Sequence, residues 1–172
     1  MWARSNVISR VARRARQLRR DRRGATLVEF SLIAFPSLIL LLGTFEIGFL
    51  YWANQELENA TRDAARLVRT GEAQTRNLNQ AQLKSEVCSR TAILVGCGSR
   101  LRLDVRSAPS FDAITPPDPN NGSGGLKSDG EFSYAPGTGN DVVLVSAFFD
   151  WRLLLSGTTI IRAAAPARNE PF

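Results

Sequence analysis

The stretch Phe30–Trp52 constrains this chain most, because its 23 residues contain a single charge, Glu46. As an α-helix it would be about 35 Å long, and the hydrocarbon core of a bilayer is about 30 Å thick. Its segment "SLILLLG" is apolar on every side, whereas a helix on a soluble core shows one apolar stripe. The sequence therefore predicts a transmembrane helix over residues 25–53, with Tyr51 and Trp52 as interfacial anchors.

Positive charge is concentrated before this helix. Residues 1–24 hold nine arginines and one aspartate, a net charge of +8, so the rest of the chain carries −2 of the total +6. Arginine-rich flanks stay in the cytoplasm, which predicts that the C-terminal part faces outward. A cleaved secretory signal or a twin-arginine signal fits less well, because the apolar run is too long and no small-x-small site follows it.

A short pattern joins the basic block to the helix. Gly24 ends the block, and Glu29 and Phe30 follow in "GATLVEF". A free amine at Ala25 would lie about 6 Å along the helix axis from Glu29. A carboxylate at the membrane edge is costly without a partner, and this amine, in the same or a neighbouring chain, would be one. A favourable interaction of an acid with the helix N-terminus would also explain Glu29. It would not explain why a basic block, a glycine, an acid, an aromatic residue and an apolar helix follow one another.

This order of features resembles a type IV prepilin signal, and G-x-x-x-x-E-[FY] is typical of Flp pilins and their pseudopilin relatives. More narrowly, the chain resembles the TadE-like family of tight-adherence (Tad) pilus assembly proteins. The further matching residues are Val28, Pro36, Gly43, Glu46, Gly48, the run "ATRDAAR" at 60–66 and the ending "ARNEPF".

The resemblance implies a minor pseudopilin that is not an enzyme. A prepilin peptidase would cut between Gly24 and Ala25, and Glu29 and Phe30 would act in recognition and assembly. The implied partners are other Tad pseudopilins, Flp pilin and inner-membrane Tad assembly proteins. The implied location is the bacterial inner membrane, single-pass, with a cytoplasmic N-terminus and a periplasmic head. Because more than a hundred residues follow the apolar helix, a minor role is expected rather than that of the major pilus subunit.

The remaining sequence predicts an α+β fold: a long transmembrane and stalk helix, then a small head with one further helix and a short antiparallel sheet. Residues 1–24 would form a basic leader, 54–71 a helical stalk capped by Gly71, and 72–172 the head. The further helix is predicted over Asn79–Val95. Strands are predicted over 100–107, 141–151 as the central strand, and 158–165.

Several residues in these regions have both a functional and a structural interpretation. Gly43 and Gly48 would permit close contact with a neighbouring helix. Cys88 and Cys97 are expected to form a disulfide outside the inner membrane, the alternative being two buried thiols. The segment 116–125 is expected to be a surface loop without a function, and the alternative is a contact with a partner. The segment 148–151 is expected to lie in the core, and the alternative is again a contact with a partner.

The composition of the chain argues against several other classes of function. The chain has no histidine, which removes the commonest general base and most zinc sites, so no metal or cofactor is predicted. A membrane-tethered envelope enzyme would need a Ser–Lys or paired-carboxylate site, and no motif surrounds the only lysines, Lys84 and Lys127. A binding module unrelated to pili is the other alternative. The arginine block could attract anionic lipid transiently, and no nucleic-acid partner is predicted.

Overall fold

The computed structural model describes residues 23–154 and 157–172, so residues 1–22 of the predicted leader lie outside the described residues. The chain divides into two compact units, Met1–Phe45 and Glu46–Phe172. In chain order the elements are α2 (Arg23–Arg69), α3 (Glu72–Thr75), α4 (Gln80–Ser89), α5 (Cys97–Arg100), β1 (Leu101–Ala108), η1 (Phe111–Ala113), η2 (Asp129–Glu131), β2 (Val142–Leu153) and β3 (Gly157–Arg168).

The α+β prediction is confirmed. A long apolar helix precedes a head that contains a further helix and a three-stranded antiparallel sheet in the order β1-β2-β3. Leu101 pairs with Phe149 at one end of the β1–β2 ladder, and Val142 pairs with Arg168 at one end of the β2–β3 ladder. The nearly continuous apolar run over 141–151 correctly indicated the central strand, because a strand covered on both faces has no polar side.

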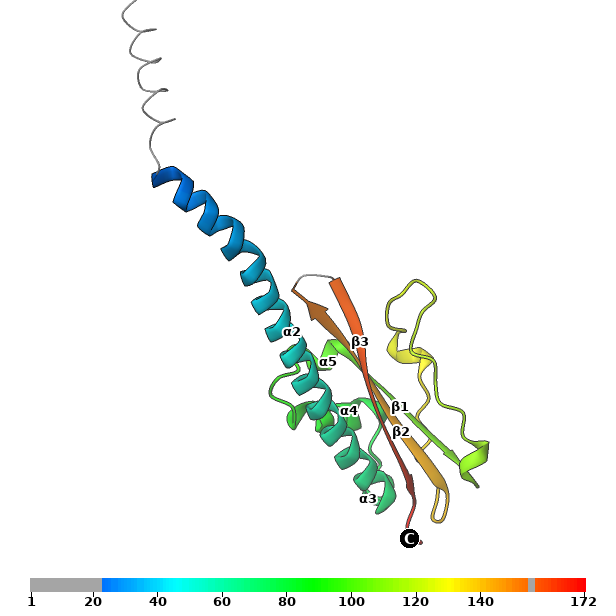
Figure 1. The fold of residues 1–172 in the computed structure, drawn as a ribbon. Helices are drawn as coiled ribbons and strands as arrows, with labels where there is room; N and C mark the ends of the chain where they lie inside the picture. Colours follow the sequence, from blue (N-terminus) through cyan, green and yellow to red (C-terminus); the bar gives the residue numbers. More distant parts are fainter. Residues whose placement is uncertain (1–22, 155–156) are drawn as a thin grey trace, which may run out of the picture. The chain divides into compact units, whose positions relative to one another are not determined.

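The core of the second unit lies between one face of the sheet and the helices (Figure 1). The sequence alternation in β1, β2 and β3 sends every second side chain to this face. Alanines on α2 and on the sheet let the helix approach the sheet closely. The buried residues include Ala53, Leu57, Ala60, Ala64, Leu67 and Val68 of α2, Leu83 and Val87 of α4, and Leu103, Val105, Val145, Ala147, Phe149, Ala163 and Ala165 of the sheet.

The opposite face of the sheet is covered by the segment between β1 and β2 (Figure 1). The Phe132 ring stacks on Phe148 with the centroids 5.6 Å apart. The fully buried carboxylate of Asp104 accepts the backbone N–H of Ser133 at 2.9 Å and pairs with Arg106 at 2.7 Å. Phe148 and Phe149 are therefore core residues, as predicted, and Trp151 is partly buried against the same core.

The predicted loop over 116–125 has more local order than its composition indicated. A bridge between Asn120 and Leu126 closes a short turn, and the Asn121 side chain accepts the backbone N–H groups of Ser123 and Gly125. Asn side chains commonly organise turns in this way.

Helix α4 is shorter than predicted. Asn79 caps it reciprocally with Gln82, as expected, but it ends at Ser89 rather than Val95. A continuous helix would separate the Cα atoms of Cys88 and Cys97 by about 13.5 Å, whereas the structure places them 5.6 Å apart. The chain therefore turns back after Ser89 and buries Leu94 on the way.

Candidate functional site

The predicted processing and assembly motif lies on the first two turns of α2. Gly24, Ala25, Glu29 and Phe30 are exposed, and a Cβ atom at Gly24 would meet nothing within 4 Å. Glu29 follows Ala25 by four positions, which puts them about one turn and 6 Å apart on the same side of the helix. No ion pair of Glu29 is present within residues 23–154 and 157–172. An amine created at Ala25 would thus find an unpaired carboxylate within reach.

Between this motif and Trp52 the surface of α2 is mostly apolar and exposed. The exposed large side chains include Leu32, Ile33, Phe35, Leu38, Leu40, Leu41, Phe45, Ile47, Phe49, Tyr51 and Trp52. The hydroxyl groups on this surface form hydrogen bonds within the helix itself. Ser31, Ser37 and Thr44 donate, respectively, to the backbone carbonyls of Val28, Ile33 and Leu40. Within the described residues, α2 is the one helix long and apolar enough to cross a membrane. It fits a single-pass membrane anchor.

The two candidate packing glycines lie on different sides of α2. A Cβ atom at Gly43 or Gly48 would meet nothing within 4 Å, so both positions leave open space. Five helical residues correspond to about 500° of rotation, which separates the two directions by about 140°. One neighbouring helix cannot contact both glycines in the same way. Gly48 shares its side with Thr44, and Gly43 shares its side with Glu46.

Comparison with known protein families gives one finding for this helix. Residues 24–66 match the TadE-like protein family. The resemblance seen in "GATLVEF" and "ATRDAAR" is confirmed over this part of the chain, about a quarter of its length. TadE-like proteins are pilus assembly components and not known enzymes, and the match relates residues 24–66 of this chain to them. The family also agrees with a membrane location.

The head, from α3 onward, lies outside the matched residues. Neither curated proteins nor solved structures gave a significant match to the chain. What the head does must therefore be argued from its own residues.

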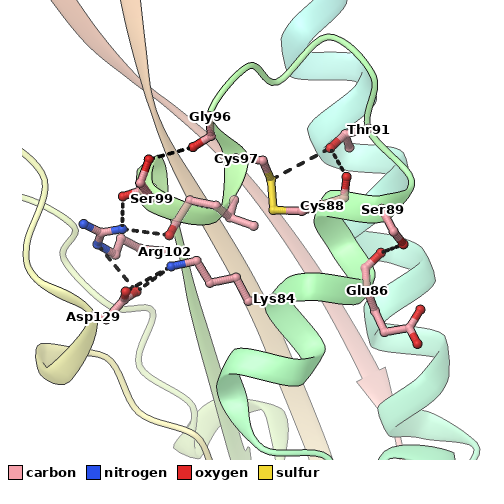
Figure 2. Close-up of a disulfide and its surroundings, with 11 residues drawn as sticks. Lys84, Glu86, Cys88, Ser89, Thr91, Gly96, Cys97, Ser99, Arg102 and Asp129 are labelled. Carbon is pink, nitrogen blue, oxygen red and sulfur yellow. Dashed lines mark hydrogen bonds and ion pairs between the residues drawn. A yellow bond between two sulfur atoms is a disulfide. The ribbon is translucent and has the colours of Figure 1, made fainter.

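The disulfide between Cys88 and Cys97 joins the end of α4 to the start of α5 (Figure 2). The hydroxyl of Thr91, a buried residue inside the ring that the bond closes, donates to the carbonyl of Cys88 at 3.3 Å. The bond thus fixes a loop that covers one end of the core. No free cysteine remains.

Both lysines serve the packing of the head. Lys84 is largely buried, and its ammonium donates to both oxygens of Asp129 at 3.0 and 3.1 Å (Figure 2). Arg102 approaches the same carboxylate at 3.5 Å. The Lys127 ammonium donates to the carbonyl of Asp118 at 2.9 Å. The contacts of Asp129 tie the segment between β1 and β2 to α4 and to β1, whereas the Lys127 contact lies within that segment. The absence of catalysis stays a prediction.

The ending "ARNEPF" has a structural role that the sequence did not reveal. Asn169 is 2% exposed, and its amide donates to the carbonyls of Pro136 and Thr138 at 2.9 and 3.0 Å. The backbone N–H of Glu170 donates to the carbonyl of Arg69, the last residue of α2, at 2.8 Å. This segment therefore fastens the end of α2 to the turn before β2. The resemblance that the sequence suggested for this ending lies outside the residues that match the family.

The same turn contains a strongly hydrogen-bonded carboxylate. Asp141 accepts the backbone N–H of Thr138 at 2.8 Å and its hydroxyl at 2.9 Å. The backbone bond first, and then the hydroxyl bond, lower the pKa of the Asp141 carboxyl below its ordinary value of 3.8. Gly137, directly before Thr138, has a φ of +71°, and a Cβ atom at this position would clash with Ser107.

Proposed function

We propose that this protein is a minor pseudopilin that assists assembly of Tad/Flp type IV pili in the bacterial inner membrane. The carrying observation is the motif Gly24–Phe30 at the start of a 47-residue helix whose N-terminal part is apolar and exposed, within the residues that match the TadE-like family. The N-terminus is cytoplasmic and the head periplasmic, in agreement with the arginine block before the helix. The partners are prepilin peptidase, other Tad pseudopilins, Flp pilin and the inner-membrane Tad assembly proteins.

Processing prepares the helix for lateral association. The peptidase cuts after Gly24, and the amine of Ala25 becomes a cation at the membrane edge. Glu29 is the nearest carboxylate along the helix, and pairing lowers the cost of keeping either charge close to lipid. When the pair forms between two chains it sets their axial register, because a slip of one helix along the other would leave both charges unpaired.

The remaining helix surface then provides the packing contact. Apolar side chains give little driving force for helix association in lipid, so close approach depends on small residues. Gly48 and Thr44 on one side, and Gly43 on another, are the positions where a second backbone can come near. Two different faces suit a component that contacts more than one neighbour in an assembly of parallel helices.

The proposal is tested by removing the carboxylate of Glu29. In cells that lack the endogenous protein, a Glu29→Ala variant should be cleaved and retained in the membrane yet form at least tenfold fewer pili. Glu46→Gln is the matched control, because it removes the other acid of the same apolar segment and keeps an acceptor oxygen, and it should support normal piliation. Normal piliation by Glu29→Ala would contradict the role assigned to this acid.

A further inference from the structure

The end of β2 exposes an apolar side chain at an unusual place. Leu154, directly after the strand, is 86% exposed. A single exposed leucine needs no explanation in a soluble protein. This one follows Arg152 and Leu153 at the end of the sheet where Leu153 pairs with Gly157. The residues of α2 beside it suggest a reason for its exposure.

This end of the sheet lies beside the apolar part of α2. The backbone N–H of Leu154 donates to the carboxylate of Glu46. Leu50, one turn further along α2, and Trp151 of β2 both pack against the same core. All four residues belong to the unit Glu46–Phe172. The end of β2 is thus level with residues 46–50 of the helix.

Residue 46 is well inside the apolar segment. Exposed apolar side chains continue along α2 to Tyr51 and Trp52, and the polar sequence starts at Asn54. Glu46 precedes Trp52 by six residues, about 9 Å along the helix axis. The interfacial layer on each side of the hydrocarbon is only about 5–8 Å thick. If Trp52 is an interfacial anchor, Leu154 reaches the boundary of the acyl chains.

The polar groups at this depth satisfy one another. A carboxylate and a backbone N–H are both costly next to lipid without partners, and Glu46 and Leu154 provide each other with one. Arg152 precedes Leu154 by two residues, about 6.6 Å along an extended chain, on the side of the head. Its side chain is exposed and forms no ion pair within the described residues. A guanidinium at this height would face anionic lipid headgroups.

We propose that the end of β2, with Leu154 at its tip, inserts into the outer leaflet of the membrane, with Arg152 at the headgroups. The head is then held against the bilayer by a second contact besides α2, which limits its rotation and fixes the face that it presents to partners. The inference rests on the membrane-spanning role of α2 in the proposed function.

A spin label tests the contact in the full chain. Both native cysteines are in the disulfide, so a nitroxide reacts only with an added cysteine. Labels at Leu154→Cys, Leu40→Cys and Thr115→Cys are compared in nanodiscs of phosphatidylethanolamine and phosphatidylglycerol. Thr115 is the aqueous control. Its carbonyl accepts a hydrogen bond from the guanidinium of Arg106, and Arg106 lies towards the end of β1 and β2 that is opposite to Leu154.

Collision with oxygen and with a water-soluble nickel complex distinguishes the outcomes. The labels at positions 154 and 40 should collide readily with oxygen and rarely with nickel, and the label at 115 should collide with nickel. Low collision with both reagents at 154 would mean a protein neighbour, and frequent nickel collision would mean water; either overturns the inference. Nickel collision at 40 would instead overturn the membrane-spanning role of α2.

A second comparison keeps Leu154 in place, because an apolar label could itself favour lipid. A label at Thr158→Cys, which pairs with Arg152, reports on the same end of the sheet. Leu154→Asp should raise nickel collision at this label severalfold, and Leu154→Ile should leave it unchanged. Equal nickel collision in all three backgrounds would contradict the insertion of Leu154.

Discussion

Gly71 is the residue at which the end of α2 meets the C-terminal segment. Its φ of +73° is in the left-handed region, and a Cβ atom there would lie 2.7 Å from the ring of Phe172. The sequence predicted this glycine as the cap of the helix, but the ring that covers it could not be foreseen. Left-handed backbone costs other residues about 1–2 kcal/mol, and the ring adds a steric term.

Gly71→Ala should therefore destabilise the head by about 2 kcal/mol or more in urea unfolding of the full chain in detergent micelles. Gly98→Ala is the control, because Gly98 has ordinary backbone and open space around it. The double variant Gly71→Ala/Phe172→Ala should lose less than the sum of the single variants, since the clash disappears. Strict additivity would contradict the contact.

Asp141 makes the stability of the head depend on pH. Because its pKa is lowered in the folded state, its contribution is complete above the ordinary value and is lost as pH falls through the folded-state pKa. Asp141→Asn should be less stable than the wild type at pH 7, and the two unfolding free energies should converge as pH falls below the folded-state pKa. A difference that persists unchanged in acid would show that the charge of this carboxylate has no part in the stability.

The disulfide acts at the scale of an element, because it fixes the loop between α4 and α5. Closing a ring of ten residues stabilises a fold by about 3 kcal/mol. Cys88→Ser/Cys97→Ser should lower the free energy of unfolding by about this amount, and a reducing agent should lower that of the wild type equally. The reducing agent should not affect the double variant. An unchanged stability in the double variant would mean that α4, α5 and the core hold the loop without the bond.

The elements differ in how far their sequences determine them. Alternation at Leu101, Leu103 and Val105 defines a strand because its two faces meet different surroundings. The end of α4 at Ser89 could not be predicted, since the disulfide and the burial of Leu94 decide it through contacts distant in sequence. Lys84 looks like a solvated charge in the sequence and is buried, because Asp129 comes to it from another segment.

At the scale of the whole molecule, the spacing of the candidate site follows from the sequence, whereas the contacts between distant parts of the head do not. Gly24, Glu29 and Phe30 are close in sequence, so their spacing on a helix is fixed by its rise alone. The contact of Glu46 with Leu154 joins residues 108 positions apart. Such pairs depend on how α2 packs on the sheet, which no local pattern specifies.

Cleavage after Gly24 would free a cation at Ala25 with which Glu29 can pair, and the intact mass of the protein extracted from membranes reveals whether it occurs. We expect a mature chain that has lost residues 1–24 and begins at Ala25, with or without a methyl group on the new amine. A membrane-extracted protein that still carries the residues before Gly24 would rule out this cleavage.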